Sequence, residues 1–367
     1  MRVTLLGTGP VEGAGPVGCT CRRCLVAEGS AARRPAAAHI DGIVLGVDPP
    51  PVGLHVGALP AGTPDGKPDE DRTVLLVRDD TGSSVLWAPS TGPLPDDTIA
   101  ALAAAGPLGA VVLGPASGPG GPVTPLPVLA HNLARLRAEG AAQSGIPAVL
   151  VGLTHDHPPV DALALRLAAW RMTVARDGDV VPVGEDGTGW PTPPRRTLVL
   201  GGSSSGKSGT AEDLLAAEPA VVYAATGPRG GDDPDWARRL QAHRQRRPPW
   251  WRTEEGTDTA ALLTEEARPV LLDAVGTWLA TVLDHAGAWR DEPGWRDRAG
   301  GETQRLVDAW RGRRAPVVGV SEEVGLGVVP ATPAGRLFRE ELGRLNQRLA
   351  EESERVLLVV AGREIEL

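Results

Sequence analysis

The chain has 367 residues, of which 41% are hydrophobic and 23% are charged, and this is enough for two domains with buried cores. Its formal net charge of -9 at pH 7 argues against a general nucleic-acid or anionic-membrane binder and favours small-molecule partners. The sequence has no apolar run of about 18 residues and opens without the pattern of a signal peptide, so we expect a cytoplasmic protein with no membrane span.

Short β-like runs separated by turns fill the first half of the chain, with two helix-like segments between them. The expected strands cover residues 3–6, 43–47, 73–77, 84–88, 110–113 and 148–153. The expected helices cover residues 128–139 and 159–170. This pattern predicts an α/β or sandwich-type domain over residues 1–183. A turn-rich, proline-containing stretch follows and predicts a linker over residues 184–195.

All three cysteines of the chain, Cys19, Cys21 and Cys24, lie in one short C-x-C-x-x-C loop. That spacing suits a metal site better than a disulfide framework, in agreement with a reducing compartment. A structural Zn²⁺ would need one more ligand, for which His155 and His157 are the candidates. The alternative is that the three cysteines are free thiols in a loop.

The second half, residues 196–367, alternates strand-like and helix-like segments. The expected strands cover residues 197–200, 220–224, 270–272, 317–320 and 355–360. The expected helices cover residues 209–217, 277–286 and 334–352. This alternation predicts an α/β domain with a mainly parallel sheet and helices on both faces.

A glycine- and serine-rich turn connects the first strand and the first helix of the second half. It fits the phosphate-binding pattern G-x-x-x-x-G-K-[ST] at every fixed position, through Gly201, Gly202, Ser203, Ser204, Ser205, Gly206, Lys207 and Ser208. Backbone N–H groups of such a turn point at phosphate oxygens, Lys207 reaches the β and γ phosphates, and Ser208 offers its hydroxyl to Mg²⁺. Only Lys67 and Lys207 are lysines among 37 basic residues, which argues against a flexible turn that contains a lysine by chance.

Two further residues of the second half are candidates for chemistry. Asp273 ends the apolar run PVLLD and would bind Mg²⁺ at a strand end, although an aspartate there can also cap the next helix. His243 stands among Arg238, Arg239, Arg244, Arg246 and Arg247. Composition alone favours the solvated end of a helix. In the functional alternative, the arginines keep the imidazole neutral and hold a triphosphate while a ring nitrogen attacks phosphorus.

Several separated motifs of the second half occur together in order. They are GGSSSGKS, YAATG at 223–227, His243 followed by Arg247-Pro248 and Trp251-Arg252-Thr253, LLDAVGTWL at 271–279, VSEEVGLGVVP at 320–330 and GRLNQRLAE at 343–351. Residues 196–367 thereby resemble the bifunctional adenosylcobinamide kinase and adenosylcobinamide-phosphate guanylyltransferase family of cobalamin biosynthesis. The resemblance implies an open P-loop NTPase-type sheet and a homo-oligomer.

The resemblance also implies two activities. ATP or GTP phosphorylates the aminopropanol hydroxyl of adenosylcobinamide, and adenosylcobinamide phosphate then receives GMP from GTP, giving adenosyl-GDP-cobinamide and pyrophosphate. The second step is implied to run through a guanylyl-histidine at His243, with Lys207 and Asp273 as further catalytic residues. Glu322 departs from the family, in which many members carry asparagine, and adds a negative charge near the phosphate site. The implied nucleotide-binding residues outside the turn are Arg247, Glu254 and Glu323.

The first half is similar to the metallo-β-lactamase-fold hydrolases, in the branch that opens with LLGTG and continues with a C-x-C-x-x-C loop. That resemblance implies an αββα domain with a structural zinc held by Cys19, Cys21, Cys24 and His155. The sequence has no H-x-H-x-D-H cluster, and Gly152 stands where another metal-binding histidine is expected. We therefore expect a non-catalytic domain that keeps its structural zinc.

Two other functions stay open on the sequence. Another P-loop small-molecule kinase would account for the nucleotide site but would have no use for His243. A non-catalytic nucleotide-binding module would not need Lys207, Ser208, Asp273 and His243 together.

Overall fold

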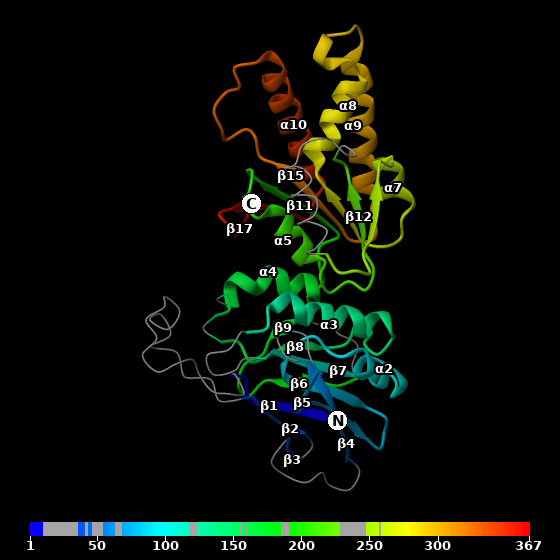
Figure 1. Cartoon of the computed structure of the whole chain (residues 1–367), viewed down its shortest axis with the longest axis vertical. Coiled ribbons are helices and arrows are strands. Elements are labelled where there is room, and N and C mark those ends of the chain that lie inside the picture. The colour runs from blue at the N-terminus through cyan, green and yellow to red at the C-terminus, as the bar shows by residue number, and fades with distance from the viewer. Residues whose placement is uncertain are drawn as a thin grey trace, which may run out of the picture. The chain divides into compact units, whose positions relative to one another are not determined.

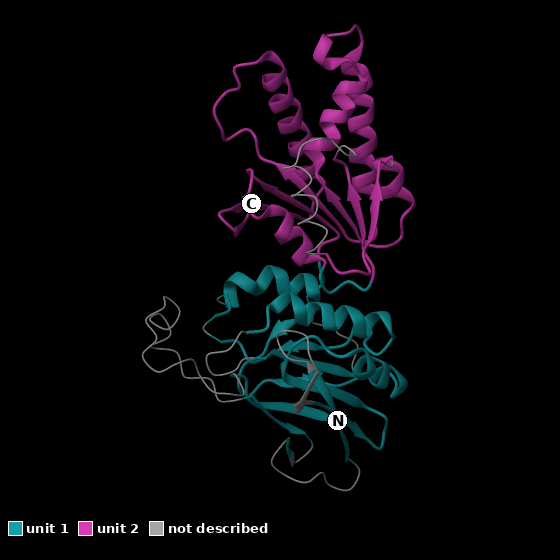
Figure 2. Ribbon diagram, viewed as in Figure 1, with its two compact units in different colours: residues 1–193, 216–219 teal, residues 194–215, 220–367 magenta. Residues whose placement is uncertain are grey.

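The computed structural model describes residues 1–9, 36–40, 43–45, 54–62, 68–116, 123–154, 156–158, 160–184, 191–227, 247–256 and 258–367. The chain divides into two compact units, which Figure 2 shows in separate colours. The first unit comprises residues 1–193 and 216–219, and the second comprises 194–215 and 220–367. No helix in the described part of the chain combines the length and the apolar character needed to cross a membrane.

The second unit is built on a seven-stranded sheet with the order β13-β12-β14-β15-β11-β16-β17 (Figure 1). The strands are β11 (Arg196–Gly201), β12 (Val222–Ala225), β13 (Arg252–Glu255), β14 (Val270–Asp273), β15 (Val317–Glu322), β16 (Arg355–Val360) and β17 (Arg363–Glu366). All neighbouring pairs are parallel except β16 and β17. The carboxyl ends of the six parallel strands therefore lie at one edge of the sheet, where ligands bind in open α/β sheets.

Helices cover both faces of this sheet. They are α5 (Lys207–Leu214), α7 (Thr259–Glu265), α8 (Val275–His285), α9 (Trp295–Gly312) and α10 (Pro333–Glu351), with a short 3-10 helix at Ala288–Arg290. Leu198, Ala224 and Leu272 point to one face and pack in a core with α7, α8, α9 and α10. Tyr223 alternates with these residues along the strand and therefore points to the other face. On that face, the negative charge of Glu212 in α5 helps to raise the pKa of the Tyr223 hydroxyl. The predicted mainly parallel sheet with helices on both faces is confirmed.

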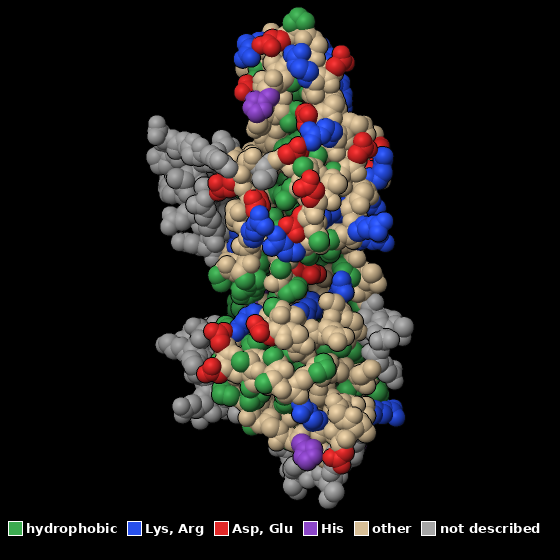
Figure 3. All heavy atoms as spheres, turned by 90° about the vertical axis from the view of Figure 1, so that its right-hand side faces the viewer, with side chains coloured by type: hydrophobic (Ala, Val, Ile, Leu, Met, Phe, Trp, Pro, Cys, Tyr) green, Lys and Arg blue, Asp and Glu red, His purple; other side chains and the backbone are tan. Residues whose placement is uncertain are grey.

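The outer side of α9 carries ion pairs rather than apolar contacts. Arg305 pairs with Asp258 and Glu302, and Arg311 pairs with Glu352. Figure 3 views the molecule from the right-hand side of Figure 1, and acidic and basic side chains are interspersed over this face of the second unit. Such mixed charge keeps a helix surface in water without creating a field of a single sign.

The first unit contains two sheets. The smaller has the order β10-β1-β2-β3 and is antiparallel throughout, while the larger, β4-β5-β6-β7-β8-β9, is antiparallel up to β6 and parallel from β6 to β9. The strands are β1 (Arg2–Gly7), β2 (Ala37–Ile40), β3 (Ile43–Val44), β4 (Leu54–Gly62), β5 (Pro68–Asp79), β6 (Ser84–Thr91), β7 (Ala110–Pro115), β8 (Ala148–Leu150), β9 (Thr173–Val174) and β10 (Val180–Pro182).

Alternate residues along the strands of the larger sheet point to opposite faces and pack in two separate cores. Trp87 and Val112 face the smaller sheet and pack with Leu5 and Ile40, whereas Leu86 and Leu113 belong to the core that includes the helices. The helices are α2 (Asp96–Ala104), α3 (Leu126–Ala138) and α4 (Val160–Trp170). The described residues thus form two packed sheets and one outer helical layer. The second outer helical layer of the predicted αββα arrangement is not among the described residues.

Every element expected from the sequence overlaps an observed one, but several observed elements were not expected. In the first unit these are β2, β4, β9, β10 and α2. In the second unit they are β13, β17, α7, α9 and the 3-10 helix. The largest omission is α9, whose buried side chains are Trp295, Ala299, Leu306, Val307 and Trp310.

Candidate active site

The phosphate-binding turn joins β11 to α5, and its two fixed glycines are required by local geometry. A Cβ on Gly201 would lie 2.5 Å from the Ser205 Oγ and 2.8 Å from the Val359 carbonyl oxygen. Gly206 caps α5 with φ of 102°, a left-handed conformation that only glycine adopts without strain. By contrast, a Cβ on Gly202 would meet nothing within 4 Å. The motif spacing therefore follows from close backbone packing at Gly201 and from backbone conformation at Gly206.

Backbone hydrogen bonds tie this turn to the loops after two neighbouring strands. The Gly362 N–H donates to the Ser205 carbonyl over 2.8 Å, from the turn between β16 and β17. The Glu323 N–H donates to the Gly201 carbonyl over 3.2 Å, from the loop after β15. The shape of the turn therefore depends on the sheet as a whole.

The Lys207 side chain lies over the turn that precedes it. Its ammonium donates to the Gly202 carbonyl over 3.2 Å, and its Nζ lies 3.8 Å from Oε1 of Glu322. The side chain is only 12% exposed, so this ion pair is partly shielded from water. The cation expected to reach a triphosphate thus already has an anionic partner within the protein.

Glu322 ends β15, and its carboxyl group lies among groups of both signs. Burial raises the pKa of this carboxyl above its usual range, and the negative charge of Asp273 raises it further. Lys207 and nearby backbone N–H groups, including that of Gly276, act in the opposite direction. Gly276 leaves room for the carboxylate, since a Cβ there would collide with Oε2 of Glu322.

Asp273 ends β14 and receives a hydrogen bond from Tyr223 on the adjacent strand β12. Burial, and then the negative charge of Asp273, raise the pKa of the Tyr223 hydroxyl far above its usual range. On the face of the same ring lies the guanidinium of Arg247, with its Cζ 3.2 Å from the ring centroid. Arg247 is 9% exposed and also donates from Nη1 to Thr253 Oγ1 over 3.3 Å. One tyrosine therefore contacts both a candidate metal ligand and a candidate phosphate-binding arginine.

Two threonines order the loop that follows Asp273. Thr226 Oγ1 accepts a hydrogen bond from the Ala274 N–H over 2.9 Å and lies 2.6 Å from Thr277 Oγ1. Thr277 Oγ1 in turn donates to the Ala274 carbonyl over 2.9 Å. Neither threonine was expected at the site, although Thr226 belongs to the YAATG segment and Thr277 to the LLDAVGTWL segment.

The structure brings some of the sequence-predicted residues together and not others. Ser208 lies in the first turn of α5, directly after Lys207. Glu323 follows Glu322, and its Oε1 accepts from the Gly325 N–H over 2.6 Å. Glu254 pairs in register with Ala224, so its side chain points to the opposite face of the sheet from Asp273, where it forms an ion pair with Arg252. Glu254 therefore lies outside the cluster that the structure forms at the strand ends.

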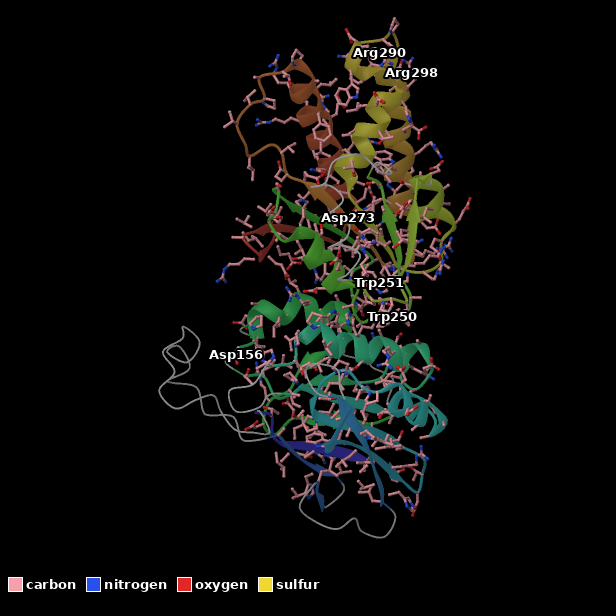
Figure 4. All side chains as sticks on the ribbon, in the orientation of Figure 1. Asp156, Trp250, Trp251, Asp273, Arg290 and Arg298 are labelled. Carbon is pink, nitrogen blue, oxygen red and sulfur yellow. The ribbon has the colours of Figure 1, made fainter. Side chains whose placement is uncertain are left out.

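Figure 4 labels Asp273 at the end of β14 and Trp251 just before β13 begins. Because β12, β13 and β14 are parallel, these two residues lie at opposite edges of the sheet. The tryptophan pair Trp250 and Trp251 is thus remote from the phosphate-binding turn within this unit.

His243 and the predicted zinc ligands Cys19, Cys21, Cys24 and His155 lie outside the described residues. The other zinc candidate, His157, is 5% exposed, and its Nδ1 accepts from the Thr154 N–H over 3.0 Å. Among the residues that the structure describes, no three His, Cys, Asp or Glu side chains are grouped so that they could hold a metal ion.

Two solved structures show low overall similarity to the chain. A diphosphatase of the PhnP family is 14% identical with a TM-score of 0.35, covering 49% of this chain and 97% of its own. An ATPase from a bacterial type III secretion system is 14% identical with a TM-score of 0.30, covering 45% of this chain and 50% of its own.

Sequence comparison finds a family model and curated relatives that match the second unit. The family model described as cobinamide kinase / cobinamide phosphate guanyltransferase matches residues 197–367. The bifunctional adenosylcobalamin biosynthesis protein CobP of Pseudomonas aeruginosa is 41% identical over 172 residues, which span 46% of this chain and 94% of that protein. The bifunctional protein CobU of Salmonella typhimurium is 40% identical over 176 residues, 45% of this chain and 95% of that protein. The chain therefore belongs to the cobinamide kinase / cobinamide phosphate guanyltransferase family.

Proposed function

We propose that residues 196–367 phosphorylate the aminopropanol hydroxyl of adenosylcobinamide with ATP or GTP and then transfer GMP from GTP to the new phosphate. The observation that carries the proposal is the gathering of Lys207, Asp273 and Glu322 beside the turn that ends β11. A strand end, a phosphate-binding turn, a lysine and carboxylates are the parts that phosphoryl transfer requires.

In the kinase step, the backbone N–H groups of residues 201–206 and the N-terminus of α5 bind the phosphates. The Lys207 ammonium leaves Glu322 and neutralises charge on the β and γ phosphates. The cobinamide hydroxyl oxygen attacks the γ phosphorus, the bond between that phosphorus and the β–γ bridging oxygen breaks, and the nucleoside diphosphate leaves. The hydroxyl proton passes to solvent.

Ser208 and Asp273 would hold Mg²⁺ in this step. The donor set fits the ion, because a hydroxyl and a carboxylate are hard oxygen ligands and Mg²⁺ takes one or two protein ligands beside phosphate oxygens. Helix α5, which begins with Lys207 and Ser208, lies against β14, which ends with Asp273. The bound ion would neutralise negative charge on the phosphates.

In the guanylyl-transfer step, a neutral ring nitrogen of His243 attacks the α phosphorus of GTP. The bond between that phosphorus and the α–β bridging oxygen breaks, and pyrophosphate leaves. An oxygen of cobinamide phosphate then attacks the same phosphorus, the phosphorus–nitrogen bond breaks, and His243 is regenerated. The guanidinium of Arg247, four residues further along the chain, is suited to hold a phosphate group during this exchange.

For the first unit we propose a non-catalytic, metallo-β-lactamase-like domain with a structural Zn²⁺ on Cys19, Cys21, Cys24 and His155. Nδ1 of the buried His157 accepts from the Thr154 N–H, so the ring proton is on Nε2 and that nitrogen has no lone pair for zinc, which favours His155 as the fourth ligand. Zinc content should fall in His155→Ala and stay unchanged in His157→Ala. The reverse result would assign the ligand to His157.

The test of the guanylyl-transfer proposal is intact-protein mass spectrometry after incubation with GTP and Mg²⁺. The parent protein should gain an acid-labile GMP adduct, and His243→Ala should not. His285→Ala, which changes a histidine at the end of α8, serves as the matched control and should keep the adduct. Absence of an adduct despite GTP binding would favour the alternative of a plain P-loop kinase. Absence of phosphoryl transfer as well would favour a non-catalytic nucleotide-binding module.

The family resemblance also supports a homo-oligomer of the whole chain. Sedimentation equilibrium of the full-length protein would test this, since a single species with the mass of one chain, 38.1 kDa, would contradict it.

A further inference from the structure

Tyr223 is the only tyrosine in the chain, and it lies in β12 between two groups of the candidate active site. Its hydroxyl donates to Oδ2 of Asp273, and its ring face carries the guanidinium of Arg247. The two contacts use different parts of the side chain. Substitution can therefore remove the hydroxyl contact while the ring contact stays.

We infer that Tyr223 is a positioning residue, which orients the Asp273 carboxylate for the metal and holds the Arg247 guanidinium for the nucleotide phosphates. This inference rests on the proposed function, because it takes Asp273 as the Mg²⁺ ligand and Arg247 as a phosphate-binding group. It adds a residue that neither the phosphate-binding turn nor the histidine step includes.

The hydroxyl contact fixes the carboxylate. A carboxylate at a strand end can rotate about its terminal bond, and a single buried donor selects one orientation. Tyr223 is 2% exposed, so water does not compete for its hydroxyl.

The ring contact fixes the arginine. A buried guanidinium needs partners on its plane as well as at its edge, and an aromatic face supplies the first. At the edge of the guanidinium, Nη1 of Arg247 donates a hydrogen bond to Oγ1 of Thr253 in β13. Because β12 lies between β13 and β14, the ring spans from one candidate ligand set to the other.

The experiment compares Tyr223→Phe, which removes only the hydroxyl, with Tyr223→Leu, which also removes the ring. Binding of Mn²⁺ in the presence of GTP is measured by electron paramagnetic resonance of the free ion, together with the KM for GTP. Tyr223→Phe should raise the Mn²⁺ dissociation constant about tenfold and leave the KM for GTP at saturating metal unchanged. Tyr223→Leu should raise both values.

Ser353→Ala is the matched control, because it also removes one side-chain hydroxyl that forms a hydrogen bond within the second unit. Ser353 accepts from Trp310 Nε1 over 3.1 Å and precedes β16, at the edge of the sheet opposite to Asp273. It should leave both the Mn²⁺ dissociation constant and the KM for GTP unchanged.

An unchanged Mn²⁺ affinity in Tyr223→Phe, with a strongly weakened affinity in Asp273→Asn, would overturn the positioning role and leave the proposed function intact. Unchanged Mn²⁺ affinity in Asp273→Asn would instead overturn the metal role of Asp273, and the inference with it. Equal effects of Tyr223→Phe and Ser353→Ala would reduce the hydroxyl contact to a general contribution to stability.

Discussion

Lys207 and Glu322 face each other at the phosphate-binding turn, with the ammonium Nζ 3.8 Å from Oε1 of the carboxylate. The lysine that the turn presents to phosphate is therefore paired within the protein. A triphosphate that binds Lys207 must replace this carboxylate as its partner, and the carboxylate then lies close to the like charge of the phosphates.

Glu322→Gln should strengthen nucleotide binding, because the amide keeps the shape of the side chain and removes the competing charge. We expect the dissociation constant for GTP to fall about fivefold, which corresponds to about 1 kcal/mol for a partly shielded ion pair. Isothermal titration calorimetry would measure it, with Glu302→Gln on the exposed side of α9 as control. Weaker binding in Glu322→Gln would mean that the carboxylate assists nucleotide binding.

Gly201→Ala should destabilise the second unit, since its Cβ would meet Ser205 Oγ at 2.5 Å and the backbone oxygen of Val359 at 2.8 Å. Overpacking of this kind costs about 2 kcal/mol, and the displaced turn should also bind nucleotide poorly. Gly202→Ala is the control, because its Cβ would meet nothing within 4 Å. Chemical denaturation of both variants would reveal the difference, and equal stability would contradict the packing argument.

The ion pair between Glu266 and Arg268 should raise the free energy of unfolding at neutral pH and lose this contribution at low pH. The hydrogen bond from the Arg268 side chain lowers the pKa of Glu266 from 4.5 to about 2. A pKa lowered by folding adds stability above 4.5, and that contribution disappears as the pH falls through about 2. The stability difference between the parent protein and Glu266→Gln should therefore shrink over this range. Glu265→Gln, which changes the preceding exposed carboxyl, should show no such loss.

Arg313→Met should destabilise the second unit strongly. The Arg313 side chain is 5% exposed and donates to the carbonyl of Leu263 over 3.0 Å and to those of Glu266 and Arg268. Three carbonyls would lose a charged donor, at a total cost of about 3 kcal/mol or more. Arg314→Met, at the adjacent exposed position, should change the unfolding free energy by less than about 0.5 kcal/mol. Similar changes in the unfolding free energy from the two substitutions would contradict a stabilising role for the three Arg313 hydrogen bonds.

Five of the seven strands of the second unit's sheet were predictable because they are short apolar runs with turns at both ends, whereas β13 (RTEE) and β17 (REIE) are mainly charged and were not. Helix α9 was not, for a local reason. It carries Gly300 and Gly301 in its middle and many charged residues, so its local propensity is poor. Its stability comes from tertiary packing, as where the Trp310 ring lies 3.0 Å from the position of a Cβ on Gly319 in β15.

The phosphate-binding turn, Lys207 and Asp273 could be read from the sequence because each belongs to a local pattern. The contacts of Tyr223 and Glu322 could not, since each joins residues that are far apart in the chain. Strand order brings them together: β12 lies next to β14 and β15 lies next to β11, although neither pair is consecutive in sequence. In the sequence, Glu322 stands out only as a departure from a family pattern, and no local pattern assigns a role to Tyr223, Thr226 or Thr277.

The hydrogen bond from Gly362 to Ser205 also has a consequence for biosynthesis. Synthesis proceeds from the N-terminus, so the turn at 201–206 leaves the ribosome long before the residue that supports it. Gly362 is made after every strand of the sheet except β17. The first unit has the opportunity to fold early, whereas the nucleotide site can close only when translation of the second unit is almost complete.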